Sequence, residues 1–307
     1  MDLSQQPQGP LAPQGPQSLH GQPATGWRAR LDLRFEDRAG RTRLVHNRHE
    51  GPLRLIKALP LADGRCQAVI VHPPGGLVGG DRLDLDIHLA PRARVLCTTP
   101  GAQKWYRSRS HAASACTRVR LDAAATLEWL PQPAIVYAAA QVDQSIAFDL
   151  ASDARFIGWE CLVLGRAAMG ERFDRGALRQ RLSLDVGRVP VWAEHLTADA
   201  TDRLFSSPLG FGGRTVACTV WAVAPDDALD DGLLQAWRGA LDAACTAPPG
   251  KAIRLAAGAS RTTAGLIAAR LLADDSESVM QVAQTLWSLA RPVVLGAASP
   301  PPRIWAT

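Results

Sequence analysis

Leu83-Asp84-Leu85-Asp86-Ile87-His88-Leu89 is the most regular stretch of the chain, because a large aliphatic residue occupies every second position and a polar residue every position between. Strict alternation is typical of a β-strand with one buried face and one face in water. Further alternating runs, separated by breaks containing Gly, Pro and Asp, are Leu31–Phe35, Thr117–Leu121, Ser145–Leu150, Leu178–Val186, Val189–Leu196, Thr215–Val223 and Thr263–Leu272. Many short strands of this kind predict a mostly β protein, built as a sandwich or as helically stacked, β-helix-like sheets.

Two segments depart from the period of two and predict α-helices near residues 226–245 and 277–290. In the first, leucines and a tryptophan recur on one helical face, and four aspartates crowd the N-terminal end, where the helix dipole favours them. In the second, we expect Ser276 to be the N-cap and Arg291-Pro292 to end the helix.

Length and composition are those of a folded soluble protein: 307 residues, 47% hydrophobic and 21% charged. We expect one β-rich domain over residues 25–307. Residues 1–24 are mostly Pro, Gln, Gly and Ser and predict a disordered tail, since they cannot bury enough apolar surface to offset the entropy of ordering. The sequence shows no signal peptide and no apolar stretch long enough to cross a bilayer, so we expect a cytoplasmic protein without a membrane partner.

The charged residues and the cysteines argue against several kinds of site. The formal net charge is +5, but the basic residues, nearly all Arg, are scattered among acids, which argues against a nucleic-acid partner. The six cysteines include no C-x-x-C pair and none at zinc-finger spacing from a His. We therefore expect buried, reduced thiols.

Three glycine-containing motifs resemble catalytic or nucleotide-binding signatures without completing them. In Gly75–Asp81 an acid stands where a phosphate loop needs Lys followed by Ser or Thr. Gly210–Gly213 is followed by Thr215 where a dinucleotide fingerprint needs its third glycine, and Gly258–Thr262 lacks the last glycine of a nucleophile elbow. We therefore expect no enzymatic activity.

An unusual string, His72-Pro73-Pro74-Gly75-Gly76-Leu77-Val78-Gly79-Gly80-Asp81, precedes the most regular strand. The two prolines fix φ and force an extended entry, while each glycine pair permits positive φ or a close backbone approach. The string predicts a rigid, tightly packed loop and does not by itself name an activity.

Further motifs follow this string in a fixed order: Thr98-Thr99-Pro100, Lys104-Trp105-Tyr106-Arg107, Leu127–Gln132, Gly158-Trp159-Glu160, Gly165-Arg166, Glu171 and Pro302-Arg303-Ile304-Trp305. From about Arg28 to Trp305 their order and spacing resemble the UreD (UreH) family of urease accessory proteins. Two positions differ from the family pattern. Pro133 stands where members often carry an acid, and Tyr137 replaces a frequent Phe.

The resemblance implies a helically stacked β fold with two helices and a role without catalysis. Proteins of this family bind apo-urease and the accessory protein UreF, which recruits the GTPase UreG, and UreE is the usual nickel donor. The resemblance therefore implies a bridge with an internal passage between UreF and urease. It implies no tightly bound cofactor, only transient passage of nickel.

Such a passage can be matched to particular residues. Imidazole, thiolate and carboxylate groups hold Ni²⁺ well, and a transit route should avoid a strong closed site. Candidate lining groups are Asp81, Glu128 and Glu160, followed by His72. A buried carboxylate needs a partner, so the alternative is that Arg166 or backbone amides pair with these acids purely for structure. The Pro-Gly string, Arg166, Arg303 and Trp305 are expected to be structural.

Two other functions stay open. One is a β-rich module that binds a carbohydrate or another small ligand without a role in metal insertion; nine tryptophans favour it, although most lie in motifs or strand runs that suggest core packing. The other is a hydrolase whose site is assembled from distant residues. His46 and His49 are interpreted as surface or strand residues and not as a metal pair.

Overall fold

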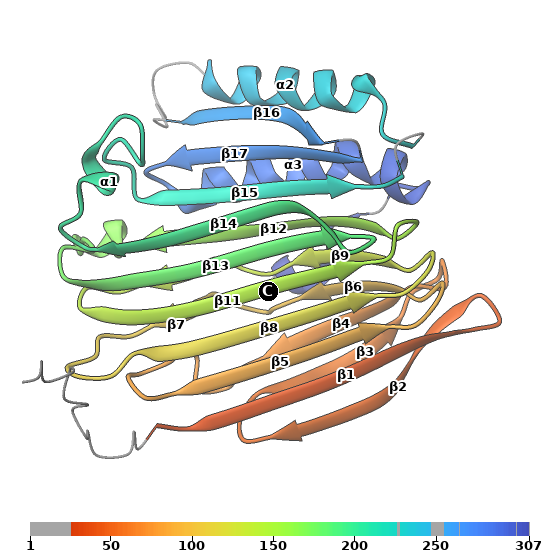
Figure 1. Cartoon of the computed structure of the whole chain (residues 1–307), viewed down its shortest axis with the longest axis horizontal. Coiled ribbons are helices and arrows are strands. Elements are labelled where there is room, and N and C mark those ends of the chain that lie inside the picture. Colours follow the sequence, from red (N-terminus) through yellow and green to blue (C-terminus); the bar gives the residue numbers. More distant parts are fainter. Residues whose placement is uncertain (1–25, 226–227, 247–254, 264, 299, 307) are drawn as a thin grey trace, which may run out of the picture.

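The computed structural model of the chain describes residues 26–225, 228–246, 255–263, 265–298 and 300–306. The predicted disordered tail at residues 1–24 lies outside these residues. Two β-sheets and a layer of helices make up the described part (Figure 1). The prediction of a mostly β, stacked-sheet fold is confirmed.

The strands form a seven-stranded sheet A and a ten-stranded sheet B. Sheet A has the spatial order β14 (Val189–Asp199), β13 (Gly176–Val186), β11 (Ala140–Leu150), β8 (Ala113–Leu121), β5 (Arg82–Leu89), β1 (Arg28–Arg38) and β2 (Arg41–Glu50). Sheet B has the order β16 (Ala256–Thr263), β17 (Leu266–Ala273), β15 (Val216–Val223), β12 (Arg155–Leu164), β9 (Thr126–Leu130), β6 (Arg94–Thr98), β4 (Cys66–Val71) and β3 (Arg54–Pro60). In addition, β10 (Ala134–Val136) pairs with β12, and β7 (Gln103–Trp105) pairs with β10.

From β4 to β13 the chain winds between the two sheets. Strands β5, β8, β11 and β13 pair in parallel in sheet A, and β4, β6, β9 and β12 pair in parallel in sheet B. Each coil adds one strand to each sheet, so equivalent positions of successive coils lie side by side. This is the helical stacking that the strand pattern predicts.

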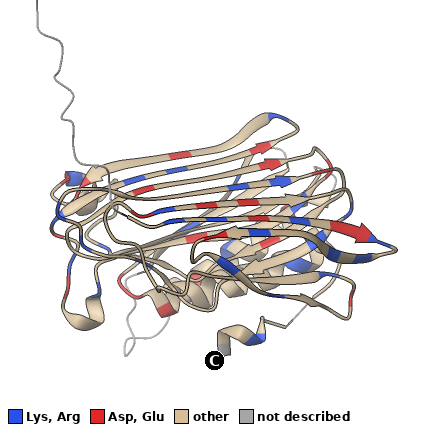
Figure 2. Ribbon diagram, turned by 90° about the horizontal axis from the view of Figure 1, so that it is seen from below, with Lys and Arg blue, Asp and Glu red and all other residues tan. Residues whose placement is uncertain are grey.

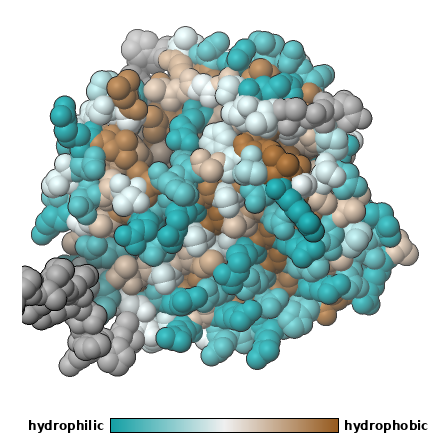
Figure 3. All heavy atoms as spheres, viewed as in Figure 1, coloured by the Kyte–Doolittle hydropathy of each residue, from teal (hydrophilic) through white to brown (hydrophobic). Residues whose placement is uncertain are grey.

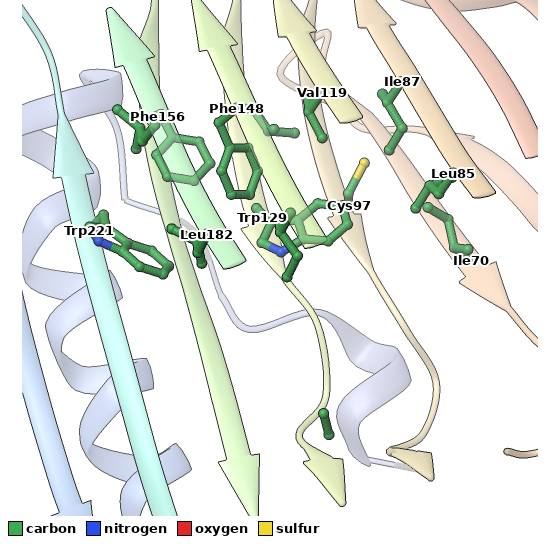
Figure 4. Close-up of a cluster of buried hydrophobic side chains, with 14 of the residues drawn as sticks. Ile70, Leu85, Ile87, Cys97, Val119, Trp129, Phe148, Phe156, Leu182 and Trp221 are labelled. Carbon is green, nitrogen blue, oxygen red and sulfur yellow. The ribbon is translucent and has the colours of Figure 1, made fainter. Parts of the chain in front are cut away.

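The main core lies between the two sheets. On sheet A, Ile87, Val119, Phe148 and Leu184 occupy one row across four parallel strands, and all four side chains are buried. Side chains of sheet B, among them Trp129, meet this row from the other side (Figure 4). Burial of apolar area on this scale is the main force that holds the two sheets together.

The outer face of sheet A is polar. Its positions alternate with the buried ones and carry acids and bases that pair across strands, as where Arg118 donates to Asp86 at 2.6 Å. In Figure 2 these charged rows lie along the top and the helices along the bottom. Exposed pairs of this kind contribute little to stability and keep the face in water.

Helices α2 (Asp231–Cys245) and α3 (Ser276–Leu295) cover the outer face of sheet B and bury a second apolar cluster. The indole of Trp237 on α2 donates to the carbonyl of Leu286 on α3 at 2.9 Å. Short helical turns are α1 (Arg203–Ser206), η1 (Ala167–Met169) and η3 (Arg303–Ala306).

The structure corrects the predicted ends of α3. Asp275, and not Ser276, is the N-cap, because its carboxylate accepts the Ser278 N–H at 2.8 Å. The helix also continues through Pro292 and ends before Gly296, which has φ of 75°. The extra turn is favoured because it buries Val294 in the second cluster, and this outweighs the bias against helix before a proline.

The two ends of the sandwich differ. One end carries tight turns such as Ala39-Gly40 and Gly187-Arg188, all with positive φ. The other, on the left in Figure 1, carries the connections 72–81, 99–112, 131–139, 165–175 and 200–215, and we call it the long-loop end. Its loops are joined by backbone hydrogen bonds, from Ser108 N–H to Ala139 C=O at 2.9 Å and from Ala139 N–H to Arg175 C=O at 2.7 Å.

Candidate functional site

A cavity of about 350 Å³ lies between the sheets next to the long-loop end. Gln144 and Ile146 of β11 stand on its sheet A wall, and Cys97, Trp129 and Glu160 on its sheet B wall. Figure 4 shows Cys97 and Trp129 projecting from sheet B into the space between the sheets. The rim comes from the Pro-Gly loop and from residues 99–104. A largely apolar space with a few polar groups can hold a small ligand or a hydrated ion.

Glu160 is the acid that this cavity contains. It lies on β12 at a position that faces sheet A, and the indole N–H of Trp129 donates to its Oε1 at 2.7 Å. Burial raises the pKa of Glu160 to about 7, and the indole hydrogen bond opposes part of that rise. A carboxyl group with this pKa exchanges a proton near neutral pH and can hold a cation without a fixed counter-charge.

His72, directly after β4, also lines the cavity. Its Nδ1 is buried and has no hydrogen-bond partner among the described residues. Burial lowers the pKa of His72, and the negative charge of Asp81 opposes this effect. A neutral imidazole with a free ring nitrogen is a suitable ligand for a passing metal ion.

Asp81 lies outside the cavity lining. Its carboxylate accepts backbone N–H groups from Trp27 at 2.8 Å and from Val78 at 2.9 Å, and the residue is buried. It closes the Pro-Gly loop against the start of β1. This geometry matches the structural alternative of an acid held by backbone amides.

Glu128 faces away from the cavity, towards α3. It accepts hydrogen bonds from Arg65, from Arg291 at 2.9 Å and from the Trp287 indole at 2.8 Å, and it is 1% exposed. Two guanidinium groups saturate this carboxylate and join the β3–β4 turn, β9 and α3. Its neighbours on β9 both face sheet A, so the alternation in the sequence already places Glu128 on the opposite face.

The Pro-Gly loop packs against the segment that follows β7. A Cβ on Gly76 would lie 2.4 Å from the ring of Tyr106, and one on Gly79 would lie 1.9 Å from Ser108 Oγ. Gly75 has φ of 77°. The backbone therefore approaches its neighbour too closely for any side chain. This close packing fixes the part of the cavity rim that carries His72.

Arg166 joins the next loops of the same end. It forms an ion pair with Glu171 and lies over the Tyr137 ring, 4.3 Å from its centroid. Tyr137 in turn meets Tyr106 edge-on, with 5.0 Å between centroids. Glu171 also accepts the Ala138 N–H at 2.7 Å. Arg166 thus orders these loops and does not pair with the three candidate acids.

The C-terminal motif lies behind the cavity wall. The Trp305 indole N–H donates to Thr98 Oγ1 at 2.9 Å, and its ring contacts those of Trp159 and Trp287 at 5.7 and 6.3 Å. Arg303 is exposed. Because Thr98 lines the cavity, the end of the chain supports that wall from outside.

Gln144, Cys97 and Trp129 are among the lining residues that sequence reasoning did not single out as such. Gln144 is 5% exposed, and its Oε1 accepts from the Gln180 side chain at 2.8 Å on the adjacent strand. The sequence did contain a signal for Gln144, because this glutamine occupies an inward position in the alternating run that leads to Phe148. Polar residues at such positions indicate an interior polar space.

Metal-ligating side chains do not converge in the described part of the chain: no group of three or more His, Cys, Asp or Glu residues there could hold a metal ion. His46 and His49 both lie exposed on β2, as expected, and His49 Nε2 lies 2.8 Å from Arg54. Among the described helices, none is both long and apolar enough to cross a membrane.

The fold and the cavity together define a class of protein. It is built from two helically stacked β-sheets that enclose a cavity with a buried acid, and its described residues assemble no metal centre. Comparison with known proteins gives the family. Residues 27–306 match the family model described as UreD urease accessory protein, and the chain belongs to this family.

Relatives of this chain are alike over nearly their full length. It is 39% identical over 295 residues to the urease accessory protein UreD of Delftia acidovorans, covering 92% of this chain and 96% of that protein. It is 39% identical over 307 residues to that of Alkalilimnicola ehrlichii, covering 100% of both chains. The match to the protein of Azoarcus sp. is 41% over 285 residues, covering 92% and 95%. A role in urease maturation follows from the family.

Proposed function

We propose that this protein is a non-catalytic cytoplasmic scaffold for inserting nickel into apo-urease. It binds apo-urease and UreF, and through UreF it meets the GTPase UreG, while UreE supplies the metal. Nickel is cargo in this proposal, and the protein keeps none of it. Membership of the urease accessory family supports the proposal.

The observation that carries the proposal is the cavity with Glu160 on its wall. A carboxyl group with a pKa of about 7 can lose its proton as Ni²⁺ approaches and regain it as the ion leaves. His72 offers a second ligand on the rim of the same space. Two ligands alone favour transit, because a closed set of three or four would retain the ion.

The test is urease activation in cells that carry Glu160→Gln, with complex assembly followed in parallel by co-purification with UreF and apo-urease. The matched control is Asp149→Asn, the same change on the exposed outer face of β11. Lost activation with intact assembly supports the route through the cavity. Normal activation by Glu160→Gln, or failure of the unmodified protein to bind either partner at micromolar concentration, contradicts the proposal.

A second candidate function is binding of a small ligand, which the size and apolar walls of the cavity favour. A compound retained by the purified protein and displaced by filling the cavity would support it. Mass spectrometry of protein released under denaturing conditions tests this candidate directly.

A further inference from the structure

The long-loop end exposes large apolar side chains. Leu209 is 99% exposed and Met169 is 74% exposed, the two highest values among the large hydrophobic residues of the described chain, and Val78 on the same end is 49% exposed. Brown surface also gathers at the upper left of Figure 3, around the region of α1. Exposed apolar groups that share one end of a molecule indicate a contact surface.

The loops that carry these side chains are firmly held. Phe205 of α1 meets Phe173 and Phe211 with ring centroids 5.9 and 5.3 Å apart, which joins connection 165–175 to connection 200–215. The Leu164 N–H donates to the Thr215 carbonyl at 2.7 Å. The apolar side chains are therefore presented on an ordered base, and binding them costs little conformational entropy.

The same end carries positive charge that the described residues leave uncompensated. No carboxylate among them lies within ion-pair distance of five cations, which are Lys104, Arg107, Arg109, Arg172 and Arg203. Figure 2 shows blue segments in these loops at the left of the view.

Acids of the long-loop end already accept hydrogen bonds from neighbouring groups within the fold. Glu171 is bound by Arg166 and by a backbone N–H, Asp81 by two backbone N–H groups, and Asp202 caps α1 by accepting the Leu204 N–H at 2.8 Å. These carboxylates keep their negative charge, but the five connections of this end contain eight Lys and Arg residues against four Asp and Glu residues, so the end remains net positive.

We propose that the long-loop end is a docking surface for a protein partner that presents carboxylates around an apolar contact. The apolar side chains give the contact area, and the cations select acidic partners and speed their association. A nucleic acid would use the cations but would leave Leu209 and Met169 in water. The observations therefore favour an acidic protein.

The docking surface would also control access of the metal to the cavity, an inference that rests on the proposed function. Lys104 lies both among the uncompensated cations and on the cavity rim. Positive charge at the rim repels a free divalent cation, and carboxylates of a docked partner would neutralise it. Docking would thus open the cavity to the metal only when the acidic partner is in place.

The experiment measures binding of purified apo-urease and, separately, UreF to Arg107→Glu/Arg109→Glu, at about 50 mM and about 500 mM salt. The control with the same change of net charge is Arg41→Glu/Arg43→Glu, on exposed positions of β2. We expect the loop variant to weaken the Kd for one partner by roughly tenfold or more at low salt, and much less at high salt, with a control change below about twofold. Leu209→Ser should weaken the same partner at both salt concentrations, and matching thermal melts should show that all variants fold.

The results distinguish this inference from the function on which it rests. If the unmodified protein binds a partner and both the loop variant and Leu209→Ser bind it as tightly as the control does, the docking surface is wrong and the proposed function stands. If the unmodified protein binds neither partner, both are wrong.

Discussion

Replacing Glu160 by Gln should remove a pH-dependent loss of stability from this protein. The carboxyl group has a pKa of about 7 in the folded chain and an ordinary value of 4.5, because burial penalises the charged form. Between these two values the folded state binds more protons than the unfolded state. Stability therefore falls as the pH rises through this range and stays reduced above pH 7.

The magnitude follows from the difference between the two pKa values. A difference from 4.5 to about 7 corresponds to about 3 kcal/mol at full ionisation. This is an upper bound, because the carboxyl group borders the cavity and water there can solvate part of its charge. We expect about 1 to 3 kcal/mol.

The assay is denaturant unfolding of wild type, Glu160→Gln and the control Asp149→Asn at pH 5 and pH 8. The amide variant should gain stability relative to wild type on going from pH 5 to pH 8, by about 1 to 3 kcal/mol. The control should show no such gain. If the free energy of unfolding changed equally with pH in wild type and Glu160→Gln, the reasoning would be refuted, since Glu160 would then carry no unfavourable buried charge.

Three further changes test the packing around the cavity. Glu128→Ala leaves the buried guanidinium of Arg291 without a carboxylate partner, whereas Arg65 keeps Asp63. It should cost about 3 to 5 kcal/mol in denaturant unfolding, and a cost below about 1 kcal/mol would contradict the buried network. Gly76→Ala forces a Cβ into the Tyr106 ring, and a loss of about 1 to 3 kcal/mol is expected in thermal melts, whereas an unchanged melt would mean that the loop is loosely packed. Trp305→Ala should cost about 1 to 3 kcal/mol and alter tryptophan fluorescence, and an unchanged spectrum would argue against its stacking on the other indoles.

Much of the fold could be predicted from the sequence, because the alternation in a strand reports directly on which side chains are buried. The run ending at Leu89 becomes β5, with its aliphatic residues in the core. The same rule assigns Glu160 and Glu128 to opposite faces of sheet B. What the rule cannot supply is the layer that each face meets. Arg291, which binds Glu128, lies 163 residues away in sequence, in a helix whose position depends on the whole sheet.

The cavity and the end of α3 are the features that could not be predicted from the sequence. A cavity is a gap between two sheets, and its size depends on the shapes of side chains from distant coils, such as Gln144 and Cys97. The predicted end of α3 at Arg291-Pro292 was wrong, because the bias against helix for the residue before a proline is a local effect of modest size. The extra turn buries Val294 in the second apolar cluster, and this outweighs the bias.

The most direct test of the central claim is nickel-dependent activation of apo-urease by a preassembled complex of this protein with UreF and UreG, with the cavity filled. Ala115→Trp places an indole at a cavity-lining position of β8, and Ala147→Trp places one on the outer face of β11 as the control. We predict that both complexes assemble and that only Ala115→Trp loses activation, by roughly tenfold or more. Full activation by an assembled Ala115→Trp complex would contradict passage of the metal through this cavity.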